Sequence, residues 1–372
     1  MILHDPALKF AHSDYGIMLP ISPSRANRIV EALTGAGKAP PILNFAAAAQ
    51  MLELPEDFIV TRQDLERLHS REYTAALYGE GPGGKQDLLG AILAAWELID
   101  EQGRYNRYQP EQAKRPLEEL FGKILAQAGG TYLVCRLALS GGGSGFCYYL
   151  GGGMHHARYA GGTGFCLIND IMLAARKIQA EQRAELVWVI DVDAHKGCGT
   201  AELVRFARER GELCAIDGGG NLPQIFSLSI HMARGWPLDE KTLAKARTGY
   251  APLVPSDVEI PVEAGEEERY IPKLEAGLRT LEQLSETFAH NSGKSRGAKP
   301  DLVIVVDGAD PYEHDGLPSS STLHLSLSQC LERDRLVYDY LHKRSIPSAW
   351  IMAGGYGERA WEPPAAFLES VC

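Results

Sequence analysis

The segment Leu186-Val-Trp-Val-Ile-Asp191-Val-Asp193-Ala-His195 is the most informative part of the sequence, because it joins an apolar run to three side chains of metal-binding type. The run Leu186–Ile190 is apolar throughout, which is typical of a strand buried on both faces of a parallel sheet. Alternate residues of an extended chain point to the same side, so Asp191, Asp193 and His195 would face one point. Carboxylates and imidazoles together are metal-ligand chemistry. Taken alone, the pattern also fits an Asp that caps the next helix beside a surface His.

Further apolar runs of strand length alternate with stretches of helical periodicity. The apolar runs are Phe146–Leu150, Ile225–Ile230, Leu302–Val306 and Ala349–Met352. The amphipathic stretches are Asn169–Glu185, Tyr270–His290 and Leu331–Lys343, with more helix expected at Ser24–Leu33, Arg62–Leu77, Leu88–Asp100 and Glu111–Ala128. Strands that alternate with helices predict an α/β fold with a mostly parallel sheet.

The organisation of the chain predicts a single domain that spans residues 1–372. A length of 372 residues would allow two or three domains, but the sequence has no internal repeat and no low-complexity tract. The polar stretch Asn291–Pro300 has the composition of a linker, yet a strand-length run follows it directly. We therefore expect a surface loop there.

Composition argues against several classes of protein. Lys and Arg number 37 against 48 Asp and Glu, a net charge of −11, which argues against a nucleic-acid binder that relies on a broad basic surface. The sequence has no run of roughly 18 apolar residues, as a membrane helix needs, and no secretory signal. Seven scattered cysteines indicate reduced thiols in the cytoplasm, and no CxxC pair offers a thiolate zinc site.

Three other loops carry chemically active side chains, each after an apolar run: His155 and His156, then Asp310, then Tyr356. Because ligands bind at the carboxyl ends of parallel strands, we expect these side chains to meet the 193–195 segment. Two carboxylates and one histidine leave a metal an open position, further histidines serve as acid and base, and a tyrosine hydroxyl stabilises an oxyanion. This set suits hydrolysis of an unactivated amide.

Four motifs, in this order along the chain, resemble the active-site signature of the histone deacetylase superfamily. They are Gly151-Gly-Gly-Met-His-His-Ala-Arg-Tyr-Ala-Gly-Gly-Thr-Gly-Phe-Cys-Leu-Ile-Asn-Asp170, Asp191-Val-Asp-Ala-His-Lys-Gly-Cys-Gly-Thr200, Gly308-Ala-Asp-Pro311 and Gly354-Gly-Tyr356. The resemblance covers residues 120–361 and is to bacterial-type deacetylase-like amidohydrolases, with some class IV features. It implies a single-domain arginase–deacetylase fold, in which helices flank a central, mostly parallel sheet of about eight strands. It also implies zinc-dependent hydrolysis of an acyl-lysine or an acetylpolyamine.

The resemblance assigns ligands and a substrate tunnel. The metal, Zn(II) or Fe(II), would be held by Asp193, His195 and Asp310. A structural potassium ion would be held by Asp191, the Ser229 hydroxyl and the carbonyls of Asp193, His195 and Ile230. The acyl-lysine tunnel would be lined by Gly164, Phe165, Trp236 and Gly354.

The resemblance also assigns the catalytic groups. His156 becomes the general base that takes a proton from the metal-activated water, and it or His155 then protonates the leaving amine. Asp191 becomes the hydrogen-bond acceptor that holds His155. Tyr356 becomes the donor that polarises the acyl carbonyl opposite the metal.

Two positions depart from the family pattern. Lys196 stands where most relatives have a second histidine, and Cys198 stands where they have Asp or Asn as the acceptor for His156. A thiol is a much weaker acceptor than a carboxylate, so the tautomer and basicity of His156 are in question. We therefore expect slower acetyl turnover than in typical relatives. The class IV branch also replaces the second histidine and removes long fatty-acyl groups, so the acyl-chain length stays open.

Two alternatives stay open beside a deacylase. A non-catalytic or weakly active acyl-amine binding protein on the same fold is favoured by Lys196 and Cys198. An arginase-like binuclear manganese hydrolase needs further Asp and His ligands, and the paired histidines and the Gly-Gly-Tyr motif favour the deacylase over it. We expect an acylated amine as the partner, no nucleic acid and no membrane. The sequence has no self-association motif, so a monomer and a dimer are equally open.

Overall fold

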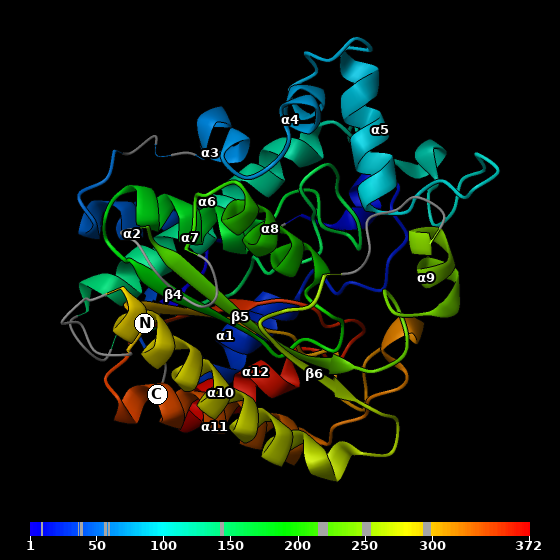
Figure 1. Ribbon diagram of the computed structural model, residues 1–372. Coiled ribbons are helices and arrows are strands. Elements are labelled where there is room, and N and C mark those ends of the chain that lie inside the picture. Colours follow the sequence, from blue (N-terminus) through cyan, green and yellow to red (C-terminus); the bar gives the residue numbers. More distant parts are fainter. Residues whose placement is uncertain are drawn as a thin grey trace.

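The computed structural model describes the chain except for residues 9, 36, 38–39, 56–57, 59, 142–144, 215–221, 248–253 and 293–298. The described residues form one sheet of eight parallel strands, in the order β2-β1-β3-β8-β7-β4-β5-β6 (Figure 1). The strands are β1 (Ile2–Leu3), β2 (Ile42–Leu43), β3 (Phe146–Tyr149), β4 (Leu186–Asp191), β5 (Gln224–Met232), β6 (Val258–Val262), β7 (Leu302–Asp307) and β8 (Ser348–Met352). The prediction of an α/β fold with about eight mostly parallel strands is confirmed.

Helices cover both faces of the sheet. They are α1 (Arg25–Gly35), α2 (Phe45–Met51), α3 (Arg62–Glu66), α4 (Arg71–Leu77), α5 (Lys85–Ala95), α6 (Glu119–Ser140), α7 (Asp170–Ala180), α8 (Cys198–Glu209), α9 (Glu240–Arg247), α10 (Tyr270–Asn291), α11 (Leu327–Lys343) and α12 (Glu362–Val371). Figure 1 shows α1, α10, α11 and α12 on one face, and α2, α3, α6, α7 and α8 on the other. None of the described helices is long and apolar enough to cross a membrane. Most of the loop expected at Asn291–Pro300 lies outside the described residues.

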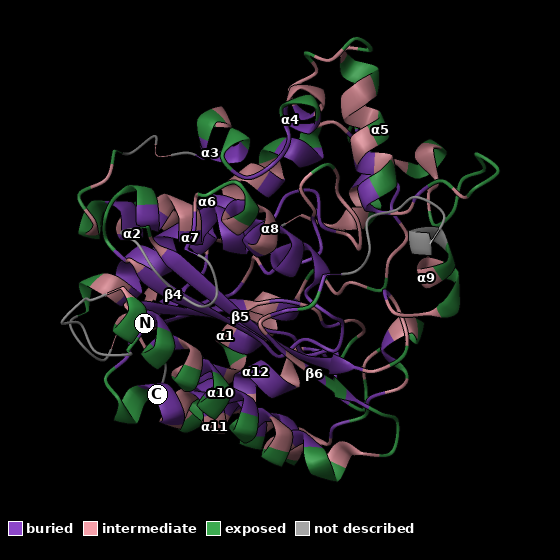
Figure 2. Cartoon of the chain, in the orientation of Figure 1, coloured by how far each residue is buried: buried purple, intermediate pink, exposed green. Residues whose placement is uncertain are grey.

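Alternation along the central strands divides the core between the two faces. Val187 and Val189 of β4 pack into the cluster beneath α6 and α7, whereas Trp188 and Ile190 pack into the cluster beneath α10 and α11. Figure 2 shows the strands buried and the outer faces of the helices exposed. Each fully buried side chain of this size contributes roughly 1.5–3 kcal/mol to stability. A strand buried on both faces explains why the run Leu186–Ile190 contains no polar residue.

Two helices differ most from their predicted bounds. The helix expected over Arg62–Leu77 is divided into α3 and α4, because the side chain of Ser70 accepts the N–H of Tyr73 and starts a new helix. The helix expected over Glu111–Ala128 is α6, which begins after Pro116 and continues to Ser140.

α6 continues past its predicted end at Ala128, and the close packing at Gly130 explains why. A Cβ at this position would collide with the rings of Phe45 and Tyr149, so glycine lets helix and strand approach closely. Tertiary packing thus outweighs the low helix propensity of Gly129 and Gly130.

The register of the central strands sets the place of the site. Asp191 at the end of β4 pairs with Val306 of β7 on one side and with Ser229 of β5 on the other. Asp307 at the end of β7 pairs with Met352 of β8. The loops that follow β4, β7 and β8 therefore leave the same edge of the sheet, side by side.

A pair of glycine substitutions within α6 tests this packing. We expect Gly130→Ala to destabilise the protein by about 1–3 kcal/mol through overpacking. The control is Gly122→Ala in the same helix, where a Cβ meets nothing within 4 Å; it should stabilise by up to about 1 kcal/mol through helix propensity. Urea unfolding measures both, and a stabilised Gly130→Ala variant would contradict the packing argument.

Candidate active site

Asp193, His195 and Asp310 meet at the carboxyl edge of the sheet. One ligand atom of each lies within 4.8 Å of the other two, and all three residues are buried. The Nδ1 atom of His195 lies 2.8 Å from Oδ2 of Asp310 and 3.2 Å from Oδ1 of Asp193. Within the part of the chain that the structure describes, no other group of His, Cys, Asp or Glu has this geometry.

Backbone amides hold both carboxylates in place. Asp193 accepts the N–H of His195 at 2.9 Å on one oxygen and that of Gly354 at 2.9 Å on the other. Asp310 accepts the N–H of Ala194 at 2.9 Å through Oδ1, which leaves Oδ2 facing His195. A Cβ at Gly354 would collide with both carboxylates, so only glycine lets the β8 loop donate here.

The charge at this point favours a cation. Burial alone would lower the pKa of His195, but the charges of Asp310 and Asp193 and their hydrogen bonds raise it to about 10. Two buried carboxylates need a compensating positive charge. A divalent metal ion on the same three donors would supply it.

The histidine pair has two different environments. Nδ1 of His155 lies 2.7 Å from Oδ2 of Asp191; although burial opposes it, the charges of Asp191 and Asp193 raise the pKa of His155 to about 9. Among the described residues, the partner of Nδ1 of His156 is the Sγ atom of Cys198, at 3.6 Å. Burial and the neighbouring imidazoles hold the pKa of His156 well below its usual value. His155 is therefore protonated on both ring nitrogens and positively charged, whereas His156 is neutral.

Two residues that sequence reasoning left without a role hold the histidine loop. The buried carboxylate of Asp170 accepts the N–H groups of Gly153 at 3.0 Å and Met154 at 2.7 Å. The side chain of Asn169 donates to the carbonyl of His155 at 3.4 Å and also caps α7. Their signal in the sequence is an Asn-Asp pair at a helix start.

The predicted tunnel residues surround the same point. The ring of Trp236 lies 4.5 Å from that of His156, nearly perpendicular to it, and Gly164 abuts both. The ring of Phe165 lies 6.2 Å from that of Tyr356. Burial and the charges of the nearby carboxylates raise the pKa of Tyr356, so its hydroxyl keeps its proton.

Two further residues were not predicted. Asp315 accepts the backbone N–H of Tyr356 at 2.7 Å, and the Ser319 hydroxyl lies 3.1 Å from Nε2 of His195. Both belong to the loop after Asp310, where no motif marks them.

The predicted potassium ligands lie beside the three candidate metal ligands. Asp191 and Ser229 are neighbours in register on β4 and β5, and Ile230 is the next residue of β5. The Ser229 hydroxyl accepts the N–H of Gly197 at 3.3 Å, so the loop that carries His195 closes over it.

The positive charge of Lys196 is compensated by the carboxylate of Glu259. The side chain is only 4% exposed, and its ammonium pairs with Oε1 of Glu259, which also lies 2.9 Å from Nε2 of His231. The other oxygen of Glu259 accepts the N–H of Ser256 at 2.8 Å. Burial would raise the pKa of Glu259, but the hydrogen bonds from His231 and Lys196 lower it to about 2.

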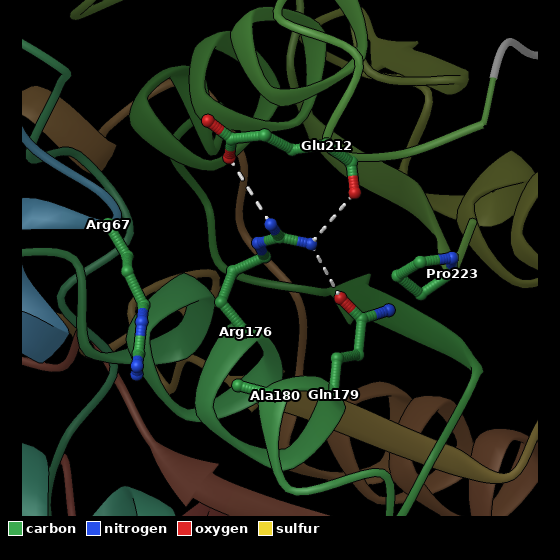
Figure 3. A pocket seen from close by; sticks show the side chains of 6 residues that line it. All are labelled: Arg67, Arg176, Gln179, Ala180, Glu212 and Pro223. Atoms are coloured by element: carbon green, nitrogen blue, oxygen red, sulfur yellow. Dashed lines mark hydrogen bonds and ion pairs between the residues drawn. The ribbon is translucent and has the colours of Figure 1, made fainter.

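A separate hollow of about 280 Å³ lies at the opposite end of the strands (Figure 3). Gln179 on its wall donates to the carbonyls of Glu185 and Gln224, where β4 and β5 begin. Arg176 is held there by Glu212 and Gln179. This hollow contains none of the predicted site residues.

Comparison with known proteins identifies the family. The model of the histone deacetylase domain matches residues 19–366. The acetoin utilization protein AcuC of Staphylococcus aureus is 30% identical over 304 residues, which are 82% of this chain and 66% of that protein. Histone deacetylase 2 of Arabidopsis thaliana is 27% identical over 62% of this chain and 48% of its own length. The aligned part is less than two thirds of either relative.

Solved structures share the fold. The acetylpolyamine aminohydrolase of Burkholderia pseudomallei superposes with a TM-score of 0.61 at 17% identity, covering 99% of this chain and 97% of that one. The HDA15 HD domain gives 0.60 at 18% identity, covering 99% and 90%.

The pKa of Glu259 predicts how replacing this residue changes the free energy of unfolding at different pH values. The folded-state pKa of about 2 lies below the reference value of 4.5, so the stabilisation is complete above pH 4.5 and is lost as the pH falls towards 2. We expect Glu259→Gln to cost about 3 kcal/mol at pH 7, with a smaller cost at pH 3.5. Urea unfolding at both pH values measures this. The control is Glu263→Gln, at an exposed pair with Arg234, which should cost less than about 1 kcal/mol. An equal cost of Glu259→Gln at pH 7 and pH 3.5 would contradict the lowered pKa of Glu259.

Proposed function

We propose that this chain, which belongs to the histone deacetylase domain family, hydrolyses the amide of an acylated amine. The observation that carries this proposal is the convergence of the Asp193, His195 and Asp310 donors in one buried group beside the paired histidines. We propose acyl-lysine and acetylpolyamine as the substrate classes. Residues 1–372 would form one catalytic domain in the cytoplasm; consistently, no disulfide joins the described cysteines.

Zn(II) is the metal we assign to Asp193, His195 and Asp310, with Fe(II) as the second candidate. Two carboxylate oxygens and one imidazole nitrogen suit either ion and leave room for substrate. When bound, the metal polarises the acyl carbonyl and lowers the pKa of water. The structural potassium ion we propose would be held by Asp191, Ser229 and the carbonyls of Asp193, His195 and Ile230.

The two histidines would divide the proton transfers. His156 is neutral and accepts the proton of the attacking water, because neighbouring charges and burial disfavour its charged form. His155 keeps its proton through Asp191 and adds positive charge beside the developing oxyanion. After attack, the proton held by His156 passes to the leaving amine, which departs neutral.

Tyr356 would stabilise the oxyanion from the opposite side. Its hydroxyl keeps its proton and donates it as a hydrogen bond to the acyl oxygen. Phe165 and Trp236 would flank the acyl chain, because each ring lies beside a catalytic side chain. The acyl group would thus be oriented before attack.

A panel of substrates tests the function. We expect the protein loaded with zinc to bind about one ion per chain and to hydrolyse at least one of acetyl-lysine peptide, long-acyl-lysine peptide and acetylpolyamine. Asp310→Ala should lower kcat/KM more than about 100-fold, whereas Asp339→Ala, at a surface pair on α11, should leave it unchanged. Bound zinc without turnover across the panel would leave the binding-protein alternative, and two metal ions per chain would favour the arginase-like one.

Cys198→Asp tests the environment of His156. A carboxylate at this position would accept from Nδ1 of His156 and raise its basicity, so we expect kcat to rise about tenfold. The acidic limb of the pH profile of kcat/KM should also move to higher pH, because a nearby negative charge raises the pKa of an imidazole. Cys330→Ser, at a buried thiol on α11, is the control and should change neither. An unchanged rate and profile in Cys198→Asp would show that the thiol does not limit the reaction.

A further inference from the structure

We infer that Arg333 is a positioning residue that fixes the separation of the two carboxylate ligands of the metal; this inference rests on the proposed function. Arg333 lies on α11, and its side chain is fully buried. It touches neither the three metal ligands nor the residues placed around the substrate. Its contacts lie behind the site, on the two loops that carry Asp193 and Asp310.

One guanidinium nitrogen of Arg333 joins these two loops. Nη1 donates to the carbonyl of Val192 at 3.0 Å and to the carbonyl of Gly308 at 2.8 Å. Val192 directly precedes Asp193, and Gly308 stands two residues before Asp310. A single atom therefore ties together the two segments from which the carboxylates project, behind the direct bond from the Ala194 N–H to Asp310.

The strand ladder between β4 and β7 ends just before the carbonyls that Arg333 binds. The ladder between β4 and β7 ends with the pair Asp191 and Val306, and the N–H of Val192 makes a further bond to the carbonyl of Val306 at 3.1 Å. Beyond this rung the two loops stay close: Asp310 accepts the N–H of Ala194 at 2.9 Å, and a Cβ at Gly308 would lie 2.7 Å from Cα of Asp193. Their carbonyls at Val192 and Gly308 lie past the last rung, and Arg333 donates to both.

The guanidinium is itself held rigidly. Nη2 donates to Oδ1 of Asp307 at 2.8 Å and Nε donates to Oδ1 of Asp334 at 2.6 Å. The second oxygen of Asp307 accepts the hydroxyl of Tyr148 at 2.6 Å. Asp307 of β7, itself held by Tyr148 of β3, and Asp334 of α11 thus fix the orientation of the guanidinium.

These contacts require an arginine. A planar fork reaches two carbonyls and two carboxylates in fixed directions, whereas the ammonium of a lysine is a single point with three donors. A buried ion pair is weak evidence for net stability, because desolvation offsets the attraction. We therefore assign the cluster to geometry: it holds Asp193 and Asp310 at the spacing that binds the metal.

Metal affinity and a metal spectrum test this role independently of catalysis. We expect Arg333→Lys to weaken zinc binding about 10- to 100-fold, as for other outer contacts of a metal site. The affinity is measured by competition with a chromophoric chelator. Cobalt(II) substituted into the site should show visible absorption bands of altered position and intensity, because the ligand geometry changes.

A matched control separates positioning from general destabilisation. Arg136 on α6 is also buried and pairs with Glu181 and the Tyr132 hydroxyl away from the site. Arg136→Lys should lower the unfolding midpoint but leave the zinc affinity and the cobalt spectrum unchanged. Equal zinc affinity and the same spectrum in Arg333→Lys and the wild type would overturn the inference, as would an equal loss in both variants.

A milder variant decides the question if Arg333→Lys does not fold. Tyr148→Phe removes only the hydroxyl that fixes Asp307, so we expect zinc binding to weaken about fivefold; unchanged affinity would then refute the role. Failure of the proposed function has a different signature. In that case the wild type binds zinc and hydrolyses no acylated amine, while the comparison of zinc affinities still tests Arg333.

Discussion

The structure depends on the burial of two carboxylates, Asp193 and Asp310, within hydrogen-bonding distance of one imidazole. Like charges in a buried place repel each other and lose the solvation of water. Three backbone N–H groups offset part of this cost, from His195, Gly354 and Ala194. These donors come from two loops at one edge of the sheet, so the arrangement exists only if β4, β7 and β8 are in register.

The fold and the centre of the site could be predicted from local patterns. An apolar run such as Leu186–Ile190 requires two buried faces, and the order of strands and helices requires a parallel sheet. In such a sheet, side chains that follow different strands meet at one edge, which is why Asp193 and Asp310 could be assigned to one group across 117 residues of sequence. The same rule placed the histidine pair and Tyr356 at this edge, and the family motifs then assigned the metal ligands and the role of each group.

The residues that support the site from behind could not be predicted, because no local sequence pattern marks their contacts. Arg333 lies in an amphipathic helix, where its sequence context does not distinguish it from an exposed charged residue. In the structure it is fully buried and binds two loops that are distant in sequence. Asp315 stands in a polar loop, and its partner is a backbone N–H of another loop. The two departures from the family pattern also differ in a way that only the structure reveals. The charge of Lys196 is met by Glu259, whereas Cys198 faces His156 without any carboxylate replacing the usual acceptor.

The order of the strands has a consequence for synthesis of the protein on the ribosome. Of the eight described strands, β8 is the last to be synthesised, yet it lies between β3 and β7 in the middle of the sheet. The loop after it supplies the Gly354 N–H that holds Asp193. A nascent chain that ends before residue 354 therefore has both carboxylates but lacks the strand and the amide that set their geometry. Domains of such long-range topology assemble slowly, so the metal site that we propose would form only after residue 354 has been synthesised.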